Sequence, residues 1–217
     1  MQIHDLSAEN SILNQFISEI RDVNIQKDPL RFRRNIERVG EVLCYELSKT
    51  LEFKTRTVQT PLGTTTMPVP VSSLVLCSVL RAGLPLHQGL LNYFDRAENA
   101  FISAYRHHPD GGHAFEVIVK YLAAPDLNGK TLVLTDPMLA TGKTLENVLK
   151  ALRAHGEPAQ IHILSVIGSK KGIAHVSGIF PEQTHLWIAA IDDTLSPSGY
   201  IIPGIGDAGD LAYGLKL

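Results

Sequence analysis

Residues 131–144, TLVLTDPMLATGKT, constrain the fold of this chain more than any other segment. The run at 132–134 has the length and the β-branched content of a buried parallel strand, which places Asp136 at the carboxyl end of a sheet. Small residues follow at 140–142, and apolar residues then recur at helical spacing from 145 to 152. The first N–H groups of such a helix are unpaired and carry the positive end of its dipole. The segment therefore predicts a strand, a loop and a helix start that can bind an anion.

The end of this segment, Gly142-Lys143-Thr144, also matches the end of a P-loop. The P-loop pattern G-x-x-x-x-G-K-[ST] requires a glycine at position 137, where this chain has Pro137. The spacing therefore excludes a P-loop. An ordinary strand–turn–helix without a ligand stays open for this segment considered alone.

The stretch DPMLATG, from Asp136 to Gly142, resembles the phosphoribosyl-diphosphate (PRPP) loop of the type I phosphoribosyltransferases, in the form typical of uracil phosphoribosyltransferases. That loop usually reads DPMLATGGS, so this chain departs from it at Lys143 and Thr144. The resemblance implies that Asp136 holds the ribose hydroxyls or metal-bound waters, while Thr141, Gly142 and Thr144 surround the 5′-phosphate. The PRPP-binding residues that it implies in this segment are Asp136, Pro137, Met138, Leu139, Ala140, Thr141, Gly142, Lys143 and Thr144.

Two arginines extend the resemblance. A strongly apolar run at 74–80 predicts a core strand that leads into Leu-Arg-Ala-Gly, which resembles the family's loop for the pyrophosphate of PRPP. Arg81 in this loop has the planar guanidinium that suits phosphate oxygens. Arg106 follows a predicted strand at 100–105 and matches the arginine of the family's flexible active-site loop, which reaches PRPP. The resemblance thus implies three catalytic residues, Asp136, Arg81 and Arg106.

The glycine-rich segment 199–214, GYIIPGIGDAGDLAYG, is too irregular to predict a helix or a strand. Its part YIIPGIGDAGD resembles the hood that reads uracil in uracil phosphoribosyltransferases, largely through backbone groups. The uracil-binding residues implied by this match are Ile201, Gly206, Asp207 and Ala208, and Asp207 is also expected to reach PRPP. The arginine that commonly follows GDAGD is replaced by Leu211, which leaves any contact of that arginine open.

The rest of the chain predicts an α/β fold. Strands alternate with helices, which favours a mostly parallel sheet flanked by helices, with ligands outside the carboxyl ends of the strands. Two helices come first, one capped by Ser7 and one starting at Asp28-Pro29, and residues 53–70 predict a hairpin or extended arm. We expect residues 1–217 to form a single domain of the type I phosphoribosyltransferase fold, with an N-terminal helical segment, a β-arm and a C-terminal hood.

Composition limits the partners and the compartment that are expected for this protein. The 217 residues are 44% hydrophobic, with a formal charge of −2 and no long basic run, which argues against nucleic acid as the main partner. Cys44 and Cys77 lie far apart, and the sequence shows neither a leader nor an apolar run of membrane-spanning length, so a reduced, cytoplasmic protein is expected. The histidines at 107, 108 and 113 suggest a metal site, but surface histidines in a glycine-bearing loop are favoured because no carboxylate pattern accompanies them. We expect no metal ligands from the protein itself.

The ordered set of motifs implies uracil phosphoribosyltransferase activity: uracil and PRPP give UMP and diphosphate, with Mg²⁺ bound through PRPP. The resemblance also implies a homodimer or homotetramer. Two alternatives stay open, an RNA-binding attenuator with the same fold and a catalytically silent relative that binds UMP or a protein. The near-neutral charge disfavours the first. The presence of Asp136, Arg81 and Asp207 disfavours the second.

Overall fold

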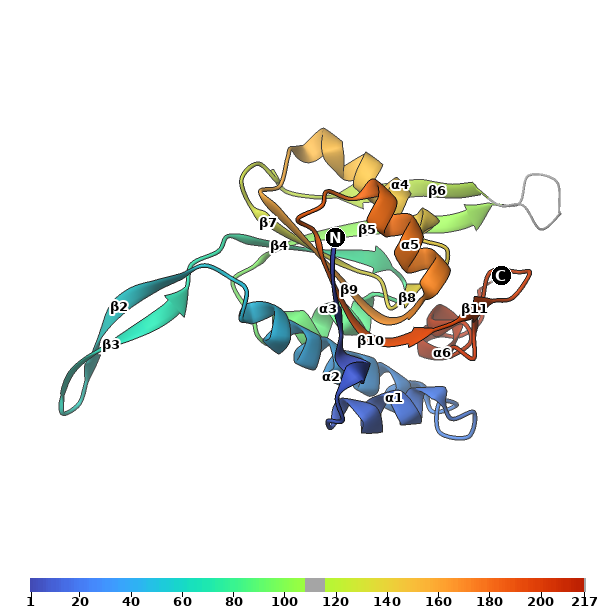
Figure 1. Cartoon of the computed structure of the whole chain (residues 1–217), viewed down its shortest axis with the longest axis horizontal. Helices are drawn as coiled ribbons and strands as arrows, with labels where there is room; N and C mark the ends of the chain where they lie inside the picture. Colours follow the sequence, from blue (N-terminus) through green and yellow to red (C-terminus); the bar gives the residue numbers. More distant parts are fainter. Residues whose placement is uncertain (108–115, 217) are drawn as a thin grey trace.

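The computed structural model describes residues 1–107 and 116–216, and a central sheet organises them (Figure 1). The strand order is β1-β10-β9-β7-β4-β5-β6, and the short strand β8 also pairs with β9. All these pairs are parallel except that of β6 with β5. The strands are β1 (Gln2–Asp5), β4 (Leu74–Leu80), β5 (Glu98–His107), β6 (Glu116–Ala123), β7 (Thr131–Thr135), β8 (Met138–Leu139), β9 (Gln160–Ser169) and β10 (His185–Asp192).

The direction of chain progression through the sheet reverses between β4 and β7. From β4 the chain passes through α3 (Leu84–Leu91) to β5 on one side, whereas β7 lies on the other side and leads on to β9 and β10. The loops that leave the carboxyl ends of β4 and β7 therefore diverge. Ligands of open α/β sheets bind in the crevice at such a switch point.

Helices cover both faces of the sheet (Figure 1). On one face, α1 (Leu13–Arg21), α2 (Pro29–Ser48) and α3 pack against side chains such as Val133 and Leu164. On the other, α4 (Lys143–Leu152) and α5 (Lys170–Ile179) pack against Leu134 and Ile163. Both faces of the central strands are buried, which explains the continuous apolar runs of their sequences. Within the described residues, no helix is both long and apolar enough to cross a membrane.

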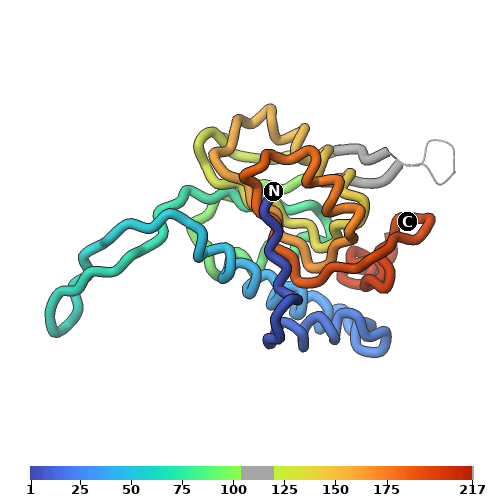
Figure 2. The backbone as a smooth tube through the Cα atoms, in the orientation of Figure 1, coloured from blue at the N-terminus to red at the C-terminus, as the bar shows by residue number. Residues whose placement is uncertain are grey.

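The predicted hairpin forms an arm, defined here as residues 53–70, that projects from the body of the molecule (Figure 2). Strands β2 (Phe53–Thr60) and β3 (Gly63–Pro70) pair only with each other among the described strands. Apolar side chains on the arm stay exposed, including Leu62 at 99% and Met67 at 50%. The arm therefore contributes no packed core of its own.

The C-terminal hood, residues 199–214, is more regular than the sequence predicts. Strand β12 (Ile201–Ile202) pairs with β11 (Thr194–Leu195), and a short helix, α6 (Ala208–Tyr213), follows. The expectation of an irregular segment was wrong because Asp207 caps α6: its carboxylate accepts hydrogen bonds from the N–H groups of Gly209 and Asp210. Buried Ala208 and Ala212 then fix the helix on the core.

The amino-terminal prediction was correct in its helices and wrong in one cap. Asp28 caps α2 as predicted, but Ser7 lies in the 3₁₀ turn η1 (Leu6–Ala8), which Asp5 caps, and α1 begins only at Leu13. The preceding strand β1, which pairs with β10, was not predicted. A four-residue edge strand gives too short a pattern to be read from the sequence.

Candidate active site

Adjacent strand ends bring the predicted residues to one edge of the sheet. Asp136 directly follows β7, Arg81 follows β4, and Arg106 lies near the end of β5, the strand next to β4. The side chain of Arg106 and the loop 108–115, with its histidines at 108 and 113, fall outside the described part of the chain, so their predicted role stays a prediction. Asp136 and Arg81 occupy the two sides of the switch point.

The phosphate loop is defined here as residues 136–142, and hydrogen bonds with β9 hold its first half. The carbonyl of Asp136 accepts a hydrogen bond from the Ser165 hydroxyl at 2.6 Å, and the Pro137 carbonyl accepts one from the N–H of Ile167 at 3.0 Å. The Asp136 carboxylate accepts a bond from the N–H of Met138 at 3.2 Å. These bonds fix the backbone, and the carboxylate lies at the loop entrance beside the strand end.

The second half of the phosphate loop is held by the start of α5. Ser169 donates to the carbonyl of Ala140 at 2.6 Å and accepts from the N–H of Gly172 at 2.9 Å. A Cβ on Gly172 would lie 2.3 Å from the Ala140 carbonyl oxygen, so only glycine permits this close approach. Gly142 is the N-cap of α4, with φ of 79°. Because it has no side chain, it cannot accept hydrogen bonds from the first N–H groups of α4 as a capping side chain would. This arrangement suits an anion.

Arg81 contacts the hood. Its guanidinium donates to the Asp210 carboxylate at 3.2 Å and to the carbonyl of Gly214 at 3.1 Å, and the ion pair is partly exposed. Nearby, burial by itself raises the pKa of Asp207, but hydrogen bonds from the Asp210 N–H, Lys216 and the Gly209 N–H outweigh it and hold the pKa below its usual value. Asp207 is therefore a carboxylate at neutral pH.

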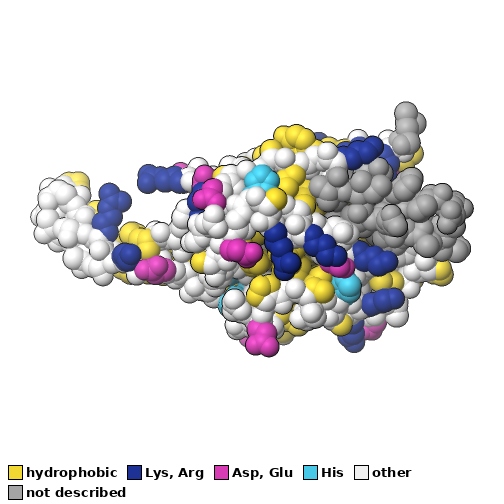
Figure 3. Space-filling view, turned by 90° about the horizontal axis from the view of Figure 1, so that it is seen from above, with side chains coloured by type: hydrophobic (Ala, Val, Ile, Leu, Met, Phe, Trp, Pro, Cys, Tyr) yellow, Lys and Arg dark blue, Asp and Glu magenta, His cyan; other side chains and the backbone are white. Residues whose placement is uncertain are grey.

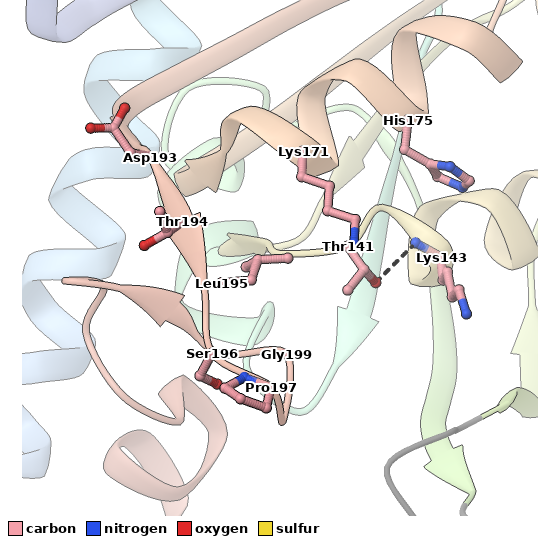
Figure 4. A pocket seen from close by; sticks show the side chains of 10 residues that line it. All are labelled: Thr141, Lys143, Lys171, His175, Asp193, Thr194, Leu195, Ser196, Pro197 and Gly199. Atoms are coloured by element: carbon pink, nitrogen blue, oxygen red, sulfur yellow. Dashed lines mark hydrogen bonds between the residues drawn. The ribbon is translucent and has the colours of Figure 1, made fainter.

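A cavity of about 710 Å³ opens between the phosphate loop, α5 and the segment that leads to the hood (Figure 4). Of the predicted residues, Thr141 and Lys143 line it. The sequence analysis missed the others, although Lys171 follows the end of the buried strand β9 as Arg81 follows that of β4. The lining residues are Thr141, Lys143, Lys171, His175, Asp193, Thr194, Leu195, Ser196, Pro197 and Gly199.

Two of the predicted uracil-binding residues belong to the apolar core that also includes part of the phosphate loop. Ile201 and Ala208 are buried in the same apolar cluster as Ala140, and Met138 packs against that cluster. Gly206 has φ of 84°, a conformation that favours glycine. The hood and the phosphate loop thus both contribute side chains to this cluster.

Carboxylate oxygens that suit a hard cation such as Mg²⁺ are few at this edge. Among the described residues, no group of three or more His, Cys, Asp or Glu side chains could hold a metal ion. Asp136 offers a carboxylate at the switch point, and Mg²⁺ prefers one or two carboxylates together with substrate phosphates and water. The donor set fits a magnesium ion carried by a diphosphate substrate.

These loops are typical of an open α/β protein whose switch-point edge suits a phosphorylated substrate. A family model described as uracil phosphoribosyltransferase matches residues 7–214. The chain is 54% identical over 217 residues to a uracil phosphoribosyltransferase of Porphyromonas gingivalis, with 100% of both chains covered. It is 37% identical over 209 residues to that of Methanothermobacter thermautotrophicus, covering 95% of this chain and 93% of the relative. The solved structure of the AQ2163 protein from Aquifex aeolicus superposes with a TM-score of 0.87 at 27% identity, over 100% of both chains.

The chain belongs to the uracil phosphoribosyltransferase family. This confirms the predicted resemblance, the predicted fold class and the predicted enzyme activity, a phosphoribosyl transfer to uracil for which the family implies PRPP. The assignment of individual residues goes further than these comparisons and is proposed below.

Proposed function

We propose that the switch-point edge formed by Asp136, Arg81 and the start of α4 is where this chain transfers the phosphoribosyl group of PRPP to uracil. The observation that carries the proposal is the phosphate loop: it is held from below by Ser165 and Ser169, and it ends in a helix start capped by glycine. The residues of DPMLATG, with Lys143 and Thr144, surround PRPP on this proposal.

The reaction breaks the bond from ribose C1′ to the diphosphate oxygen and forms a bond from C1′ to uracil N1. The N1 proton leaves to water or with the departing diphosphate. Positive charge grows on the ribose ring in between, and the Asp136 carboxylate stabilises it, while Arg81 and Arg106 stabilise the leaving diphosphate. Bound Mg²⁺ would add Lewis-acid stabilisation of that diphosphate.

Arg81 changes partner during this cycle. In the structure its guanidinium donates hydrogen bonds to the Asp210 carboxylate and the Gly214 carbonyl of the hood, and a diphosphate has to compete with these two acceptors. A bidentate guanidinium–phosphate pair is stronger than a partly exposed bond to a carboxylate together with one to a neutral carbonyl, so the exchange is favourable. Diphosphate binding is thereby coupled to the hood that reads uracil.

Uracil is read by the hood backbone at Ile201, Gly206 and Ala208, with Asp207 nearby. Ile201 as a whole is only 3% exposed, so its side chain is part of the core. Fixed N–H and C=O directions favour uracil, because cytosine reverses one edge and leaves polar groups unpaired at about 1 to 3 kcal/mol each.

The test is incubation of the purified protein with labelled uracil, PRPP and Mg²⁺, followed by separation of UMP. We expect UMP with uracil and none with cytosine or purine bases. Comparable turnover of cytosine would contradict the uracil-reading role of the hood. Salt-dependent binding of RNA would favour the attenuator alternative.

The assembly and its setting are also proposed. The exposed apolar side chains of the arm, Leu62, Met67 and Phe53, favour contact with a second copy, so we expect a homodimer or homotetramer. Both cysteines are buried and unpaired, as expected in a reducing cytoplasm. Light scattering of the intact chain and of an arm variant with Leu62→Ser and Met67→Ser tests the assembly, and a monomer in both would contradict it.

A further inference from the structure

We infer that Lys171, at the start of α5, is a second phosphate-binding cation of the active site, contacting the 5′-phosphate that PRPP and UMP share. The inference rests on the proposed location of that phosphate at Thr141 to Thr144. It adds a residue from a different helix to the binding of the phosphate.

The position of Lys171 is fixed by its neighbours on both sides. Ser169 is fully buried and bonded to the Ala140 carbonyl, and Gly172 approaches that carbonyl so closely that a Cβ could not be added. The backbone of Lys171 is therefore held against the phosphate loop by the residues around it. From there its side chain reaches the cavity lined by Thr141, and Figure 4 shows it directed from α5 toward the segment that carries Thr141.

The charges around the cavity leave Lys171 available. Among the described residues, it makes no hydrogen bond and no ion pair. The cavity's acidic residue, Asp193, is paired with Lys170 at 2.5 Å, and His175 is bonded to Glu146 at 2.9 Å. The ammonium of Lys171 is thus not paired with the carboxylate that lines the cavity with it. Such a site attracts an anion.

Lys171 is better directed than Lys143 for this role. Figure 4 shows the Lys143 side chain extending away from the other lining residues, with only its backbone N–H near the Thr141 hydroxyl. Figure 3 shows several Lys and Arg side chains on one face of the molecule, with Asp and Glu side chains among them, so other cations also contribute to the potential. Direct contact has to be separated from this general potential.

The test compares Lys171→Gln with Lys170→Gln. Both variants remove one positive charge from the same turn of α5, but the Lys170 ammonium lies on Asp193 and does not line the cavity. We expect the Kd of UMP, measured by calorimetry, to rise about tenfold in Lys171→Gln and less than threefold in Lys170→Gln. The KM of PRPP should follow the Kd of UMP, while the KM of uracil and the Ki of diphosphate stay unchanged.

Other outcomes overturn the inference. Equal effects of the two variants would show a general potential, and a rise confined to the Ki of diphosphate would place Lys171 at the other end of PRPP. Circular-dichroism melting checks that both variants fold. If the wild-type protein makes UMP from labelled uracil but Lys171→Gln binds UMP normally, the lysine inference fails and the proposed function stands. If the wild-type protein neither makes nor binds UMP, the proposed function fails first.

Discussion

The two loops on either side of the switch point are held in different ways. The phosphate loop after β7 is fixed by a partly buried hydrogen bond from Ser165 and a buried one from Ser169. The arginine loop after β4 sends Arg81 into a partly exposed contact with Asp210 and Gly214 of the hood. Both loops come from a strand end at the same edge of the sheet, and only their supports differ.

This difference assigns different tasks to the two loops. Buried hydrogen bonds in a low-dielectric surrounding are costly to break, so the phosphate loop is already in its binding shape. An exposed ion pair contributes little to stability and exchanges readily, so Arg81 can leave Asp210 for a phosphate. One loop provides a fixed cradle, and the other connects substrate binding to the hood.

The largest effect is expected for Asp136→Asn, which removes the charge of the fixed loop and keeps its shape. If the carboxylate stabilises the ribose cation in the transition state more than in bound PRPP, kcat falls by about tenfold to a thousandfold with little loss of stability. Steady-state kinetics and thermal melting check this. Unchanged kcat and unchanged PRPP affinity would mean that Asp136 has no part in the reaction.

A smaller effect is expected for Ser169→Ala. The variant leaves the buried Ala140 carbonyl and the Gly172 N–H without their partner, which costs about 1 to 3 kcal/mol of unfolding free energy. The loosened loop should also bind PRPP more weakly. Urea unfolding and the KM of PRPP measure the two effects, and a variant as stable as the wild type would remove the contrast between the loops.

The matching variant in the other loop is Asp210→Asn. Because the pair with Arg81 is partly exposed, the expected loss of unfolding free energy is below about 1 kcal/mol. Released from its charged partner, Arg81 should bind diphosphate up to about threefold more tightly. A loss as large as that of Ser169→Ala, or weaker diphosphate binding, would show that the hood contact is structural.

The contact between α4 and α5 beside the fixed loop is expected to contribute to stability in a pH-dependent way. Hydrogen bonds from Lys150 on α4 and His175 on α5 hold the pKa of Glu146 below its usual value of 4.5. The folded state therefore binds this proton less readily than the unfolded state, so the contribution is present above pH 4.5 and is lost as the pH falls further. The stability difference between wild type and Glu146→Gln should shrink over that range by less than about 1 kcal/mol. A constant difference down to pH 3 would contradict the linkage.

The sequence predicted the fixed loop better than its supports. DPMLATG, the strand before it and the helix after it form one continuous pattern that reports on local structure. Ser169 and Gly172 support the same loop from 29 or more residues away, and a single sequence carries no sign of that contact beyond a strand followed by a helix start. The hood helix was missed for a related reason, because glycine composition outweighed the cap at Asp207.

The smallest effect is expected for Lys143→Gly, where the family usually has glycine. The Lys143 N–H belongs to the helix start that is proposed to hold the 5′-phosphate, and glycine keeps that N–H. Figure 4 shows the side chain extending away from the other residues that line the cavity. An inward ammonium near 4 Å from a phosphate would have a gross Coulomb energy of about 4 kcal/mol at an effective dielectric of 20, much reduced by desolvation and side-chain ordering. With the ammonium outward, the Kd of PRPP should stay within about threefold, a change below 1 kcal/mol. A tenfold or larger loss of PRPP affinity, steeper at low salt, would show that Lys143 is a phosphate ligand. The fixed loop would then depend on a flexible cation of its own, as the arginine loop does.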